Sequence, residues 1–402
     1  MLKRYKKLPQ HVFILSLVSF LNDTSSDIIY PLLPVFLTVT LGASPFAIGF
    51  IEGMAESVSA ILKLFSGYIS DRFQRRKPLV LAGYALSATL RPFLAFATNW
   101  VQVLILRISD RLGKGLRAAP RDALLSMQVP VEMRGIAFGF NRAADNLGAV
   151  LGPLIASILI SLIAENKENP SAVEYQKIFL IASVPAIIAV LVTLFFVKEE
   201  TNHLEIEKIP IKLSLEGFDA NFKRFLLAIS LFTLSNSTDA FLLLKAQQTG
   251  VSIENLPILW MFLNISKVIA SLVGGEFSDK VGRKRVILSG WILYAFVYLG
   301  FGFATNQTQV WILFFLYGFY FGFTEGVERA MVADLVPKEK RGTAYGLYAF
   351  AFSITVFPAS VIFGFIWQTF SLRSAFIFGA FLSLCASALL LTVKDGRNHQ
   401  NH

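Results

Sequence analysis

Runs of about 20 apolar residues recur along the whole chain, and they restrict its fold more than any other feature. A run of that length is what an α-helix needs to cross the hydrocarbon core of a bilayer. Of the 402 residues, 54% are hydrophobic and only 16% are charged, and the mean hydropathy is +0.59. Soluble domains carry roughly 25% charged residues. The sequence therefore predicts an all-α integral membrane protein.

We expect about twelve transmembrane helices from these runs. They cover residues 11–38, 46–70, 77–97, 100–123, 135–163, 176–197, 222–247, 254–278, 285–304, 308–333, 342–368 and 372–393. A polar connector over residues 198–221 divides them into an N-terminal six-helix bundle, 1–197, and a C-terminal one, 222–402.

The loops between the spans alternate between a basic set and a set with few cations. "KRYKK", "RFQRRK", "DKVGRKR" and "PKEKR" belong to the first set, and "ATNW" and "TNQTQ" to the second. Because Lys and Arg gather in cytoplasmic loops, both termini are expected in the cytoplasm, with a bacterial inner membrane as the expected location. The net charge of +10 belongs to these loops, so it does not indicate nucleic-acid binding. No cleavage site follows the basic N-terminus, and we interpret the first apolar run as an uncleaved span.

The two halves of the chain repeat each other. "GYISDRFQRRK" from Gly67 corresponds to "GEFSDKVGRKR" from Gly275, an offset of 208, and "VPVEMRGIAFG" from Val129 corresponds to "VPKEKRGTAYG" from Val336, an offset of 207. A duplicated six-helix unit is typical of transporters that bind solute between their halves. The single Cys385 excludes a disulfide framework.

These repeated loops resemble the signature of the major facilitator superfamily, G-x-x-x-D-[RK]-x-G-[RK]-[RK]. The second copy matches at Gly275, Asp279, Lys280, Gly282, Arg283 and Lys284, and the first at Gly67, Asp71, Arg72, Arg75 and Arg76, with Gln74 in place of a glycine. The resemblance implies two pseudo-symmetric bundles around a central cavity. It also implies secondary transport by alternating access, driven by a proton gradient and without a bound cofactor or metal.

The same loops have a physical interpretation. A carboxylate at the end of one helix faces guanidinium groups of the next loop and the N–H groups of a helix start. Such a contact can hold this end of the protein closed in one state and release it in another, so we expect these residues to form a gating latch. The alternative is that the charges only fix the topology.

The segment "VLILRISDRLGKGLRAAPRDALL", residues 103–125, combines a span with many charges. Most of its cations share one helical face, and a charged residue at the bilayer centre costs roughly 2.5–3.5 kcal/mol on insertion scales. The stripe must therefore face water or carboxylate partners. "RLGKGLRAA" from Arg111 also resembles the family's fourth-helix signature, which implies that Arg111 lies in the transport core. Lys114 and Arg117 stand where Gln and Gly are usual, and this excess of positive charge favours an anionic, carboxylate-bearing substrate.

Charged residues also interrupt many of the other spans. The candidate substrate-binding or proton-coupling residues are Asp23, Asp27, Glu52, Glu56, Arg91, Arg107, Asp110, Arg111, Lys114, Arg142, Asp145, Asp239, Glu325 and Glu328. Any one of them can instead be half of an ion pair that fixes helix packing, but so many intramembrane charges indicate function. Asp27 and Asp239 each follow a run of Ser, Thr and Asn in comparable places of the two halves. Since every His lies at a span end, in a loop or in the tail, a proton relay has to use carboxylates, with Glu56, Asp27, Asp239, Glu325 and Asp145 preferred in that order.

The fifth span contains "NLGAVLGPLIAS", which resembles the family's antiporter signature through Gly148, Gly152 and Pro153. The resemblance favours proton antiport, although close helix packing alone explains the glycines. We therefore expect export of a metabolite, siderophore or drug by a functional monomer in the bilayer, with proton-driven uptake of an anionic nutrient or metal chelate as the alternative. No phosphate loop, G-x-S-x-G or H-E-x-x-H motif occurs, which argues against a primary pump or an enzyme with a catalytic residue. A channel would not need the repeat with its paired latches, and a purely sensory or scaffolding membrane protein remains the other non-enzyme alternative.

Overall fold

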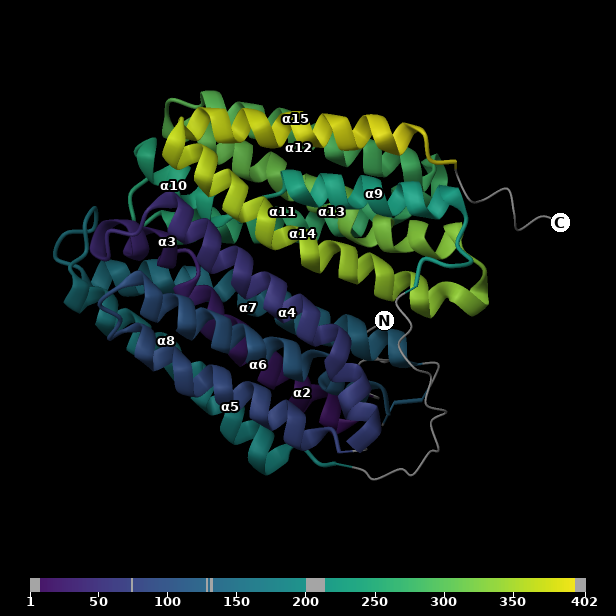
Figure 1. Cartoon of the computed structure of the whole chain (residues 1–402). Coiled ribbons are helices and arrows are strands. Elements are labelled where there is room, and N and C mark those ends of the chain that lie inside the picture. Colours follow the sequence, from purple (N-terminus) through teal and green to yellow (C-terminus); the bar gives the residue numbers. More distant parts are fainter. Residues whose placement is uncertain (1–7, 74, 128, 131–132, 200–213, 395–402) are drawn as a thin grey trace. The chain divides into compact units, whose positions relative to one another are not determined.

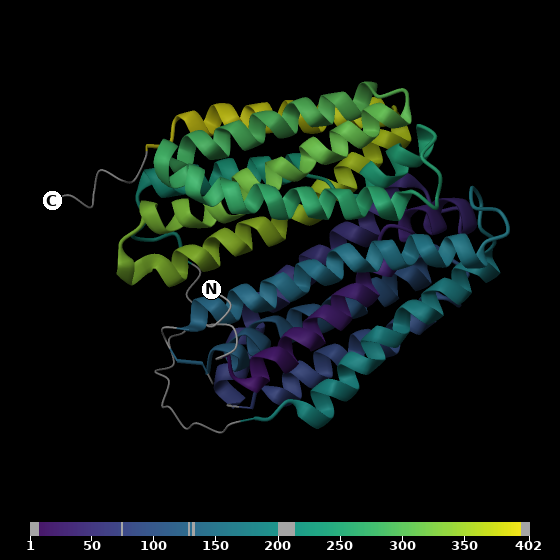
Figure 2. The same cartoon turned by 180° about the vertical axis from the view of Figure 1, so that it is seen from behind.

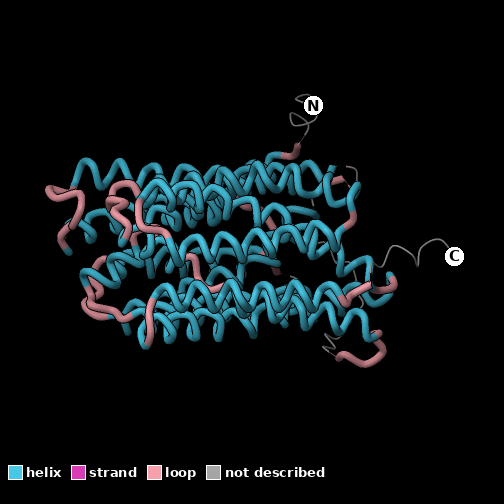
Figure 3. The backbone as a smooth tube through the Cα atoms, turned by 90° about the horizontal axis from the view of Figure 1, so that it is seen from above, coloured by secondary structure: helices cyan, strands magenta, loops and turns pink. Residues whose placement is uncertain are grey.

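The computed structural model of the chain describes residues 8–73, 75–127, 129–130, 133–199 and 214–394. The side chains of residues 67–73, 272, 273, 275, 276 and 339 lie outside this description. All regular elements of the described part are helices joined by short loops, without a strand (Figure 3). This confirms the all-α class predicted from the sequence.

The helices follow the expected spans within a few residues (Figure 1). In chain order they are α2 (Gln10–Ile29), α3 (Leu33–Val35), the π-helix η1 (Phe36–Thr40), α4 (Pro45–Phe73), α5 (Lys77–Leu94), α6 (Trp100–Met127), α7 (Arg134–Ile163), α8 (Ala172–Phe196), α9 (Ala220–Ser235), α10 (Ala240–Gln248), α11 (Leu256–Val281), α12 (Arg283–Phe303), α13 (Gln307–Leu335), the 3₁₀ turn η3 (Lys338–Lys340), α14 (Arg341–Thr369) and α15 (Leu372–Leu391).

Nine helical stretches of the described residues are long and apolar enough to cross a membrane. They are Gln10–Thr40, Pro45–Ser66, Arg134–Ile163, Ala172–Phe196, Ala220–Gln248, Arg283–Phe303, Gln307–Leu335, Arg341–Thr369 and Leu372–Leu391. The charged helix α6 is not among them, and in α11 the apolar part is limited to Leu256–Ser271.

The chain forms two compact units. Unit 1 comprises Met1–Gly42, Val58–Ile209 and Ser252–Met261, and unit 2 comprises Ala43–Ser57, Pro210–Val251 and Phe262–His402. The first part of α4 thus groups with unit 2, and the first part of α11 groups with unit 1. These two helices carry the two copies of the repeated loop signature, so they occupy equivalent places in the two sequence halves.

Within unit 1, α2 packs against α7 and α8, and α5 packs against α6 and α8 (Figure 1). Its core joins aliphatic side chains of α2, α5 and α6, including the fully buried Val12, Val18 and Val80. Within unit 2, α12 packs against α13 and α15, and α9 packs against α14 and α15 (Figures 1 and 2). Aromatic rings fill this second core: Phe232 stacks on Trp291 with ring centroids 4.5 Å apart.

Two spans are interrupted. The first loses its α-helical hydrogen bonds after Ile29, where Pro31 and Pro34 lack the N–H that an α-helix requires. The seventh span breaks between Ser235 and Ala240. Non-helical backbone at membrane depth occurs where it is buried in protein or lines a water-filled cavity. The break at 236–239 is therefore a candidate location for a binding site.

Candidate functional site

The most highly charged cluster of unit 1 surrounds Asp110 of α6. Arg91 of α5 lies closest, with its Nε 3.4 Å from Asp110 Oδ1. Arg107, Arg111 and Arg117 also interact electrostatically with this carboxylate. All four guanidinium side chains and Asp110 are buried. One carboxylate therefore lies among four cations in the interior of unit 1.

Two of these cations also join helices. Arg91 donates to the backbone oxygen of Asn22 at 3.0 Å and to its Oδ1 at 3.1 Å, which connects α5 to α2. Arg117 donates to Ser87 Oγ at 2.9 Å and to Gly83 O at 3.3 Å, and its guanidinium lies 4.6 Å from the Tyr84 ring. Arg117 thus faces α5 and holds α6 against it. The spacing in the sequence predicted that Arg117 shares a helical face with other cations, but not which helix that residue contacts.

Asp27 of α2 lies in a polar and aromatic environment. The indole N–H of Trp260 donates to Asp27 Oδ1 at 3.1 Å, and the Trp260 ring packs on Tyr30 with centroids 4.8 Å apart. Asp23, Arg111 and Lys114 interact with Asp27 electrostatically, and the Lys114 side chain is exposed. The structure thus brings the predicted residues of the first and fourth spans together, and it adds Trp260, which the sequence did not single out.

A second polar group joins α2, α6 and α7. Arg121 contacts Ser19 Oγ at 3.0 Å, Asp122 at 2.9 Å and Asp145 at 3.9 Å. Asn141 donates to Asp145 at 3.4 Å, and the exposed Arg142 interacts with Asp145 as well. Asp23 interacts with both Asp145 and Asp27, so this group adjoins the charge cluster of unit 1.

In unit 2, Asp239 lies in the break of the seventh span. The Tyr317 hydroxyl donates to Asp239 Oδ1 at 2.7 Å, and Lys267 Nζ lies 3.9 Å from Oδ2. Asn236, in the same break, donates to the Tyr320 hydroxyl at 2.7 Å. Asp27 lies in the last turn of α2, just before the interruption of the first span, so both aspartates lie beside a helix break.

The two glutamates of the second span belong to unit 2. Glu56 interacts electrostatically with Asp239, while Glu52 is almost completely buried at 2% exposure. Lys267 lies 3.8 Å from the Phe321 ring centroid in addition to its contact with Asp239. The structure thus brings the predicted Glu56 and Asp239 together near the helix break, and it adds Lys267 of the eighth span.

The two glutamates of the tenth span lie in different environments. Glu325 is exposed and lies 3.6 Å from Arg329, one turn further along α13. Glu328 is buried and accepts hydrogen bonds from Trp291 Nε1 at 3.0 Å and from the Tyr348 hydroxyl at 2.9 Å. The sequence identified both acids but neither aromatic partner, because most Trp and Tyr residues in a helical bundle only pack.

The second copy of the loop signature forms ion pairs between helices. Arg283 Nε lies 2.9 Å from Asp334 Oδ2, and its NH2 lies 3.9 Å from Asp279 Oδ1. Gly282 has φ of +104°, a conformation that favours glycine. Lys284 donates to the carbonyls of Leu391 and Val393, both at 2.7 Å, and Lys280 lies in the last turn of α11.

The first copy is described only in part. Gln74 lies outside the described residues, and so do the surroundings of Gly67, Asp71 and Arg72 and those of Gly275 in the second copy. Glu199 accepts hydrogen bonds from the backbone N–H groups of Arg76 and Lys77, and Arg75 is exposed beside them. The Arg76 guanidinium contacts the Met127 sulfur. Met127 corresponds in the repeat to Asp334, so the described residues carry the interhelical acid only in the second copy.

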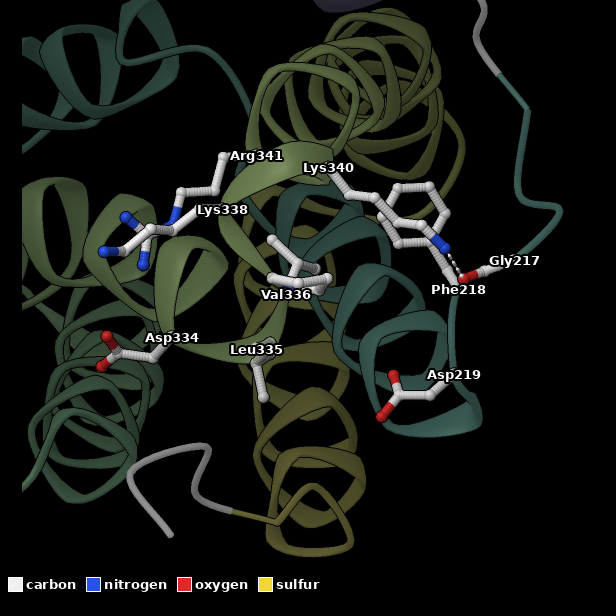
Figure 4. Close-up of a pocket in the computed structure, with 10 residues that line it drawn as sticks. Gly217, Phe218, Asp219, Asp334, Leu335, Val336, Lys338, Lys340 and Arg341 are labelled. Carbon is white, nitrogen blue, oxygen red and sulfur yellow. Dashed lines mark hydrogen bonds between the residues drawn. The ribbon is translucent and has the colours of Figure 1, made fainter. Parts of the chain in front are cut away.

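A cavity of about 460 Å³ opens beside this second copy, at the loop between α13 and α14 (Figure 4). Phe218, Leu335 and Val336 provide apolar walls. Lys340 extends toward Phe218 and donates to the Gly217 carbonyl, whereas Lys338 and Arg341 extend to the other side, where Asp334 lies (Figure 4). None of the predicted binding residues lines this cavity.

The glycines of the fifth span lie at the contact between α7 and α2. A methyl carbon at Gly148 would lie 2.8 Å from the Phe20 carbonyl oxygen, and one at Gly152 would lie 2.7 Å from that of Thr24. Pro153 lies inside α7. Close packing is therefore a sufficient structural role for both glycines. Within the described residues, no group of three His, Cys, Asp or Glu side chains is arranged to hold a metal ion.

Comparison with known proteins assigns the family. The sequence profile of the Major Facilitator Superfamily matches residues 15–266 and 224–402. An uncharacterised MFS-type transporter of Methanocaldococcus jannaschii is 34% identical over 394 residues, which covers 96% of each chain. A multi-drug resistance efflux pump, PmrA of Streptococcus pneumoniae, is 26% identical over 332 residues and 80% of each chain.

Solved structures agree on the fold. The nucleoside transporter NupG superposes with a TM-score of 0.79 at 14% identity, over 96% of this chain and 99% of that one. At this identity the likeness concerns the fold alone. Together with the repeated loop signature and the helices of the two units, these matches show that the chain is a multi-pass membrane transporter, not an enzyme, and that it belongs to the Major Facilitator Superfamily.

Proposed function

We propose that this transporter exports a small organic anion, with carboxylate groups, in exchange for protons. The observation that carries the proposal is the charge cluster of unit 1. Helix α6 alone carries the cations Arg107, Arg111, Lys114, Arg117 and Arg121 against the acids Asp110 and Asp122. An excess of positive charge in an apolar bundle is costly unless an anion approaches it.

The cations of this cluster fall into two groups according to their contacts. Arg91 and Arg117 are committed to joining α5 with α2 and α6. Lys114 is exposed on the same helix, and together with Arg111 it interacts with Asp27. We therefore assign substrate recognition to Arg111 and Lys114, because a guanidinium group can bind a carboxylate through two hydrogen bonds and an ammonium group attracts it as a point charge.

Export is favoured over uptake by the efflux function named for PmrA. The glycines of the fifth span add little, because their packing against α2 is a sufficient role for them. Coupling to protons is proposed because buried carboxylates are present in both units, whereas the described His11 lies near the start of α2 and His203, His399 and His402 lie outside the described residues. The proposal includes a monomer in the inner membrane with both termini in the cytoplasm.

The test compares cells that produce the intact protein, the Arg111→Ala variant and the Arg111→Lys variant. Untargeted metabolite profiling of medium and cytosol should find an anionic compound enriched outside only with the intact protein. With the Arg111→Ala variant this enrichment should be at least tenfold lower than with the intact protein. Arg111→Lys should retain part of it because the charge remains. A protonophore should abolish the enrichment.

Other results would contradict the proposal. Enrichment inside the cell and depletion outside would establish uptake, the alternative direction. Unchanged export by the Arg111→Ala variant at equal protein levels would remove Arg111 from substrate recognition. Export that persists after a protonophore would exclude proton coupling.

A further inference from the structure

Both hydrogen bonds to Glu328 come from neutral aromatic side chains. Glu328 is 7% exposed, and its two hydrogen-bond partners, the Trp291 indole and the Tyr348 hydroxyl, are neutral. Asp110 lies beside Arg91, and Asp334 lies beside Arg283. A buried ion pair holds its carboxylate in the charged form, whereas neutral donors allow either form.

The charged groups around Glu328 oppose each other. Glu325 and Arg329 both interact with it from α13, with opposite signs, and they form their own ion pair on the exposed side of that helix. The Tyr320 hydroxyl, also on α13, interacts with Glu328 at longer range. From α12 and α14 the groups that face it are Trp291 and Tyr348.

Trp291 and Tyr348 can both keep a hydrogen bond to Glu328 whether its carboxyl group is charged or protonated. An indole N–H can only donate, so Trp291 keeps its bond to Oε1 in either state. A tyrosine hydroxyl can donate or accept. When Oε2 carries a proton, its O–H can donate to the Tyr348 oxygen at the same 2.9 Å. Only the hydroxyl hydrogen of Tyr348 has to rotate.

We propose that Glu328 is a proton-binding site of this transporter and that Tyr348 is its switching partner. Glu328 takes a proton from water and becomes a neutral carboxylic acid, and it returns the proton as a carboxylate. The site lies where α12, α13 and α14 meet, so a relative movement of α14 would remove the Tyr348 bond and change the affinity of Glu328 for the proton. This inference rests on the proton coupling proposed above.

The experiment is infrared difference spectroscopy of the purified full-length protein between mildly alkaline and mildly acidic pH. The intact protein should show a carboxylic C=O band that grows on acidification. Glu328→Gln should lose this band, because the amide cannot take up the proton. Tyr348→Phe should keep the band but shift it to higher frequency, because one hydrogen bond is lost.

Glu216→Gln is the control, since this exposed acid lies in the loop before α9, outside the helices that carry Glu328 and its partners. It should leave the band unchanged. A band that survives in Glu328→Gln overturns the inference, and so does an unshifted band in Tyr348→Phe. The Tyr348→Phe variant still tests the inference if Glu328→Gln does not fold. If export proves insensitive to a protonophore while the Glu328 band is present, the proposed coupling fails but the proton-binding site stands.

Discussion

At the scale of single residues, Arg117 shows that an intramembrane charge can be structural. Its guanidinium bonds to Ser87 and Gly83 of α5 and lies against the Tyr84 ring. A hydrogen bond to a buried charged group contributes about 1.5–3 kcal/mol. We predict that Arg117→Ala lowers the thermal unfolding midpoint of the detergent-solubilised protein by several degrees, measured by fluorescence-detected size-exclusion chromatography after heating.

Arg75→Ala is the matched comparison, because Arg75 is exposed in the loop before α5. Exposed substitutions of this kind change stability by about 0.5 kcal/mol or less, so its midpoint should stay near that of the intact protein. Equal midpoints for the two variants would show that Arg117 does not hold α6 against α5.

At the scale of elements, the contact between α7 and α2 depends on small residues. A methyl carbon at Gly152 would lie 2.7 Å from Thr24 O and 2.9 Å from Asp27 Cβ, so the two helices would have to separate. Overpacking of this kind costs about 1–3 kcal/mol. We predict that Gly152→Ala lowers the unfolding midpoint in the same assay.

Gly139 lies on the same helix with no atom within 4 Å of an added methyl carbon. Since alanine is favoured over glycine in a helix by about 1 kcal/mol, Gly139→Ala should be neutral or stabilising. If both alanine variants behaved alike, close packing would not be the role of Gly152.

At the scale of the whole molecule, the sequence predicted the helices well and the site only in part. Apolar runs determine where spans lie, and each expected span has a helix within a few residues. The partners of the intramembrane charges depend on which helices are neighbours. Spacing indicated that Arg117 shares a face with other cations, but not that this position meets Gly83 and Ser87. Trp260, Trp291 and Tyr348 were missed for the same reason, because nothing in the sequence separates an aromatic ring that binds a carboxylate from one that packs.

The distribution of charge over the loops makes a prediction about the topology of the whole chain. Lys338 is exposed in the basic loop before α14, and Glu168 is exposed in the loop between α7 and α8. Because basic loops stay in the cytoplasm, Glu168→Cys should react with a membrane-impermeant maleimide in intact cells, and Lys338→Cys should react only after permeabilisation. Both variants need the Cys385→Ala background, since Cys385 is the one natural thiol. Labelling of Lys338→Cys, but not of Glu168→Cys, in intact cells would show the opposite topology, with basic loops outside the cell.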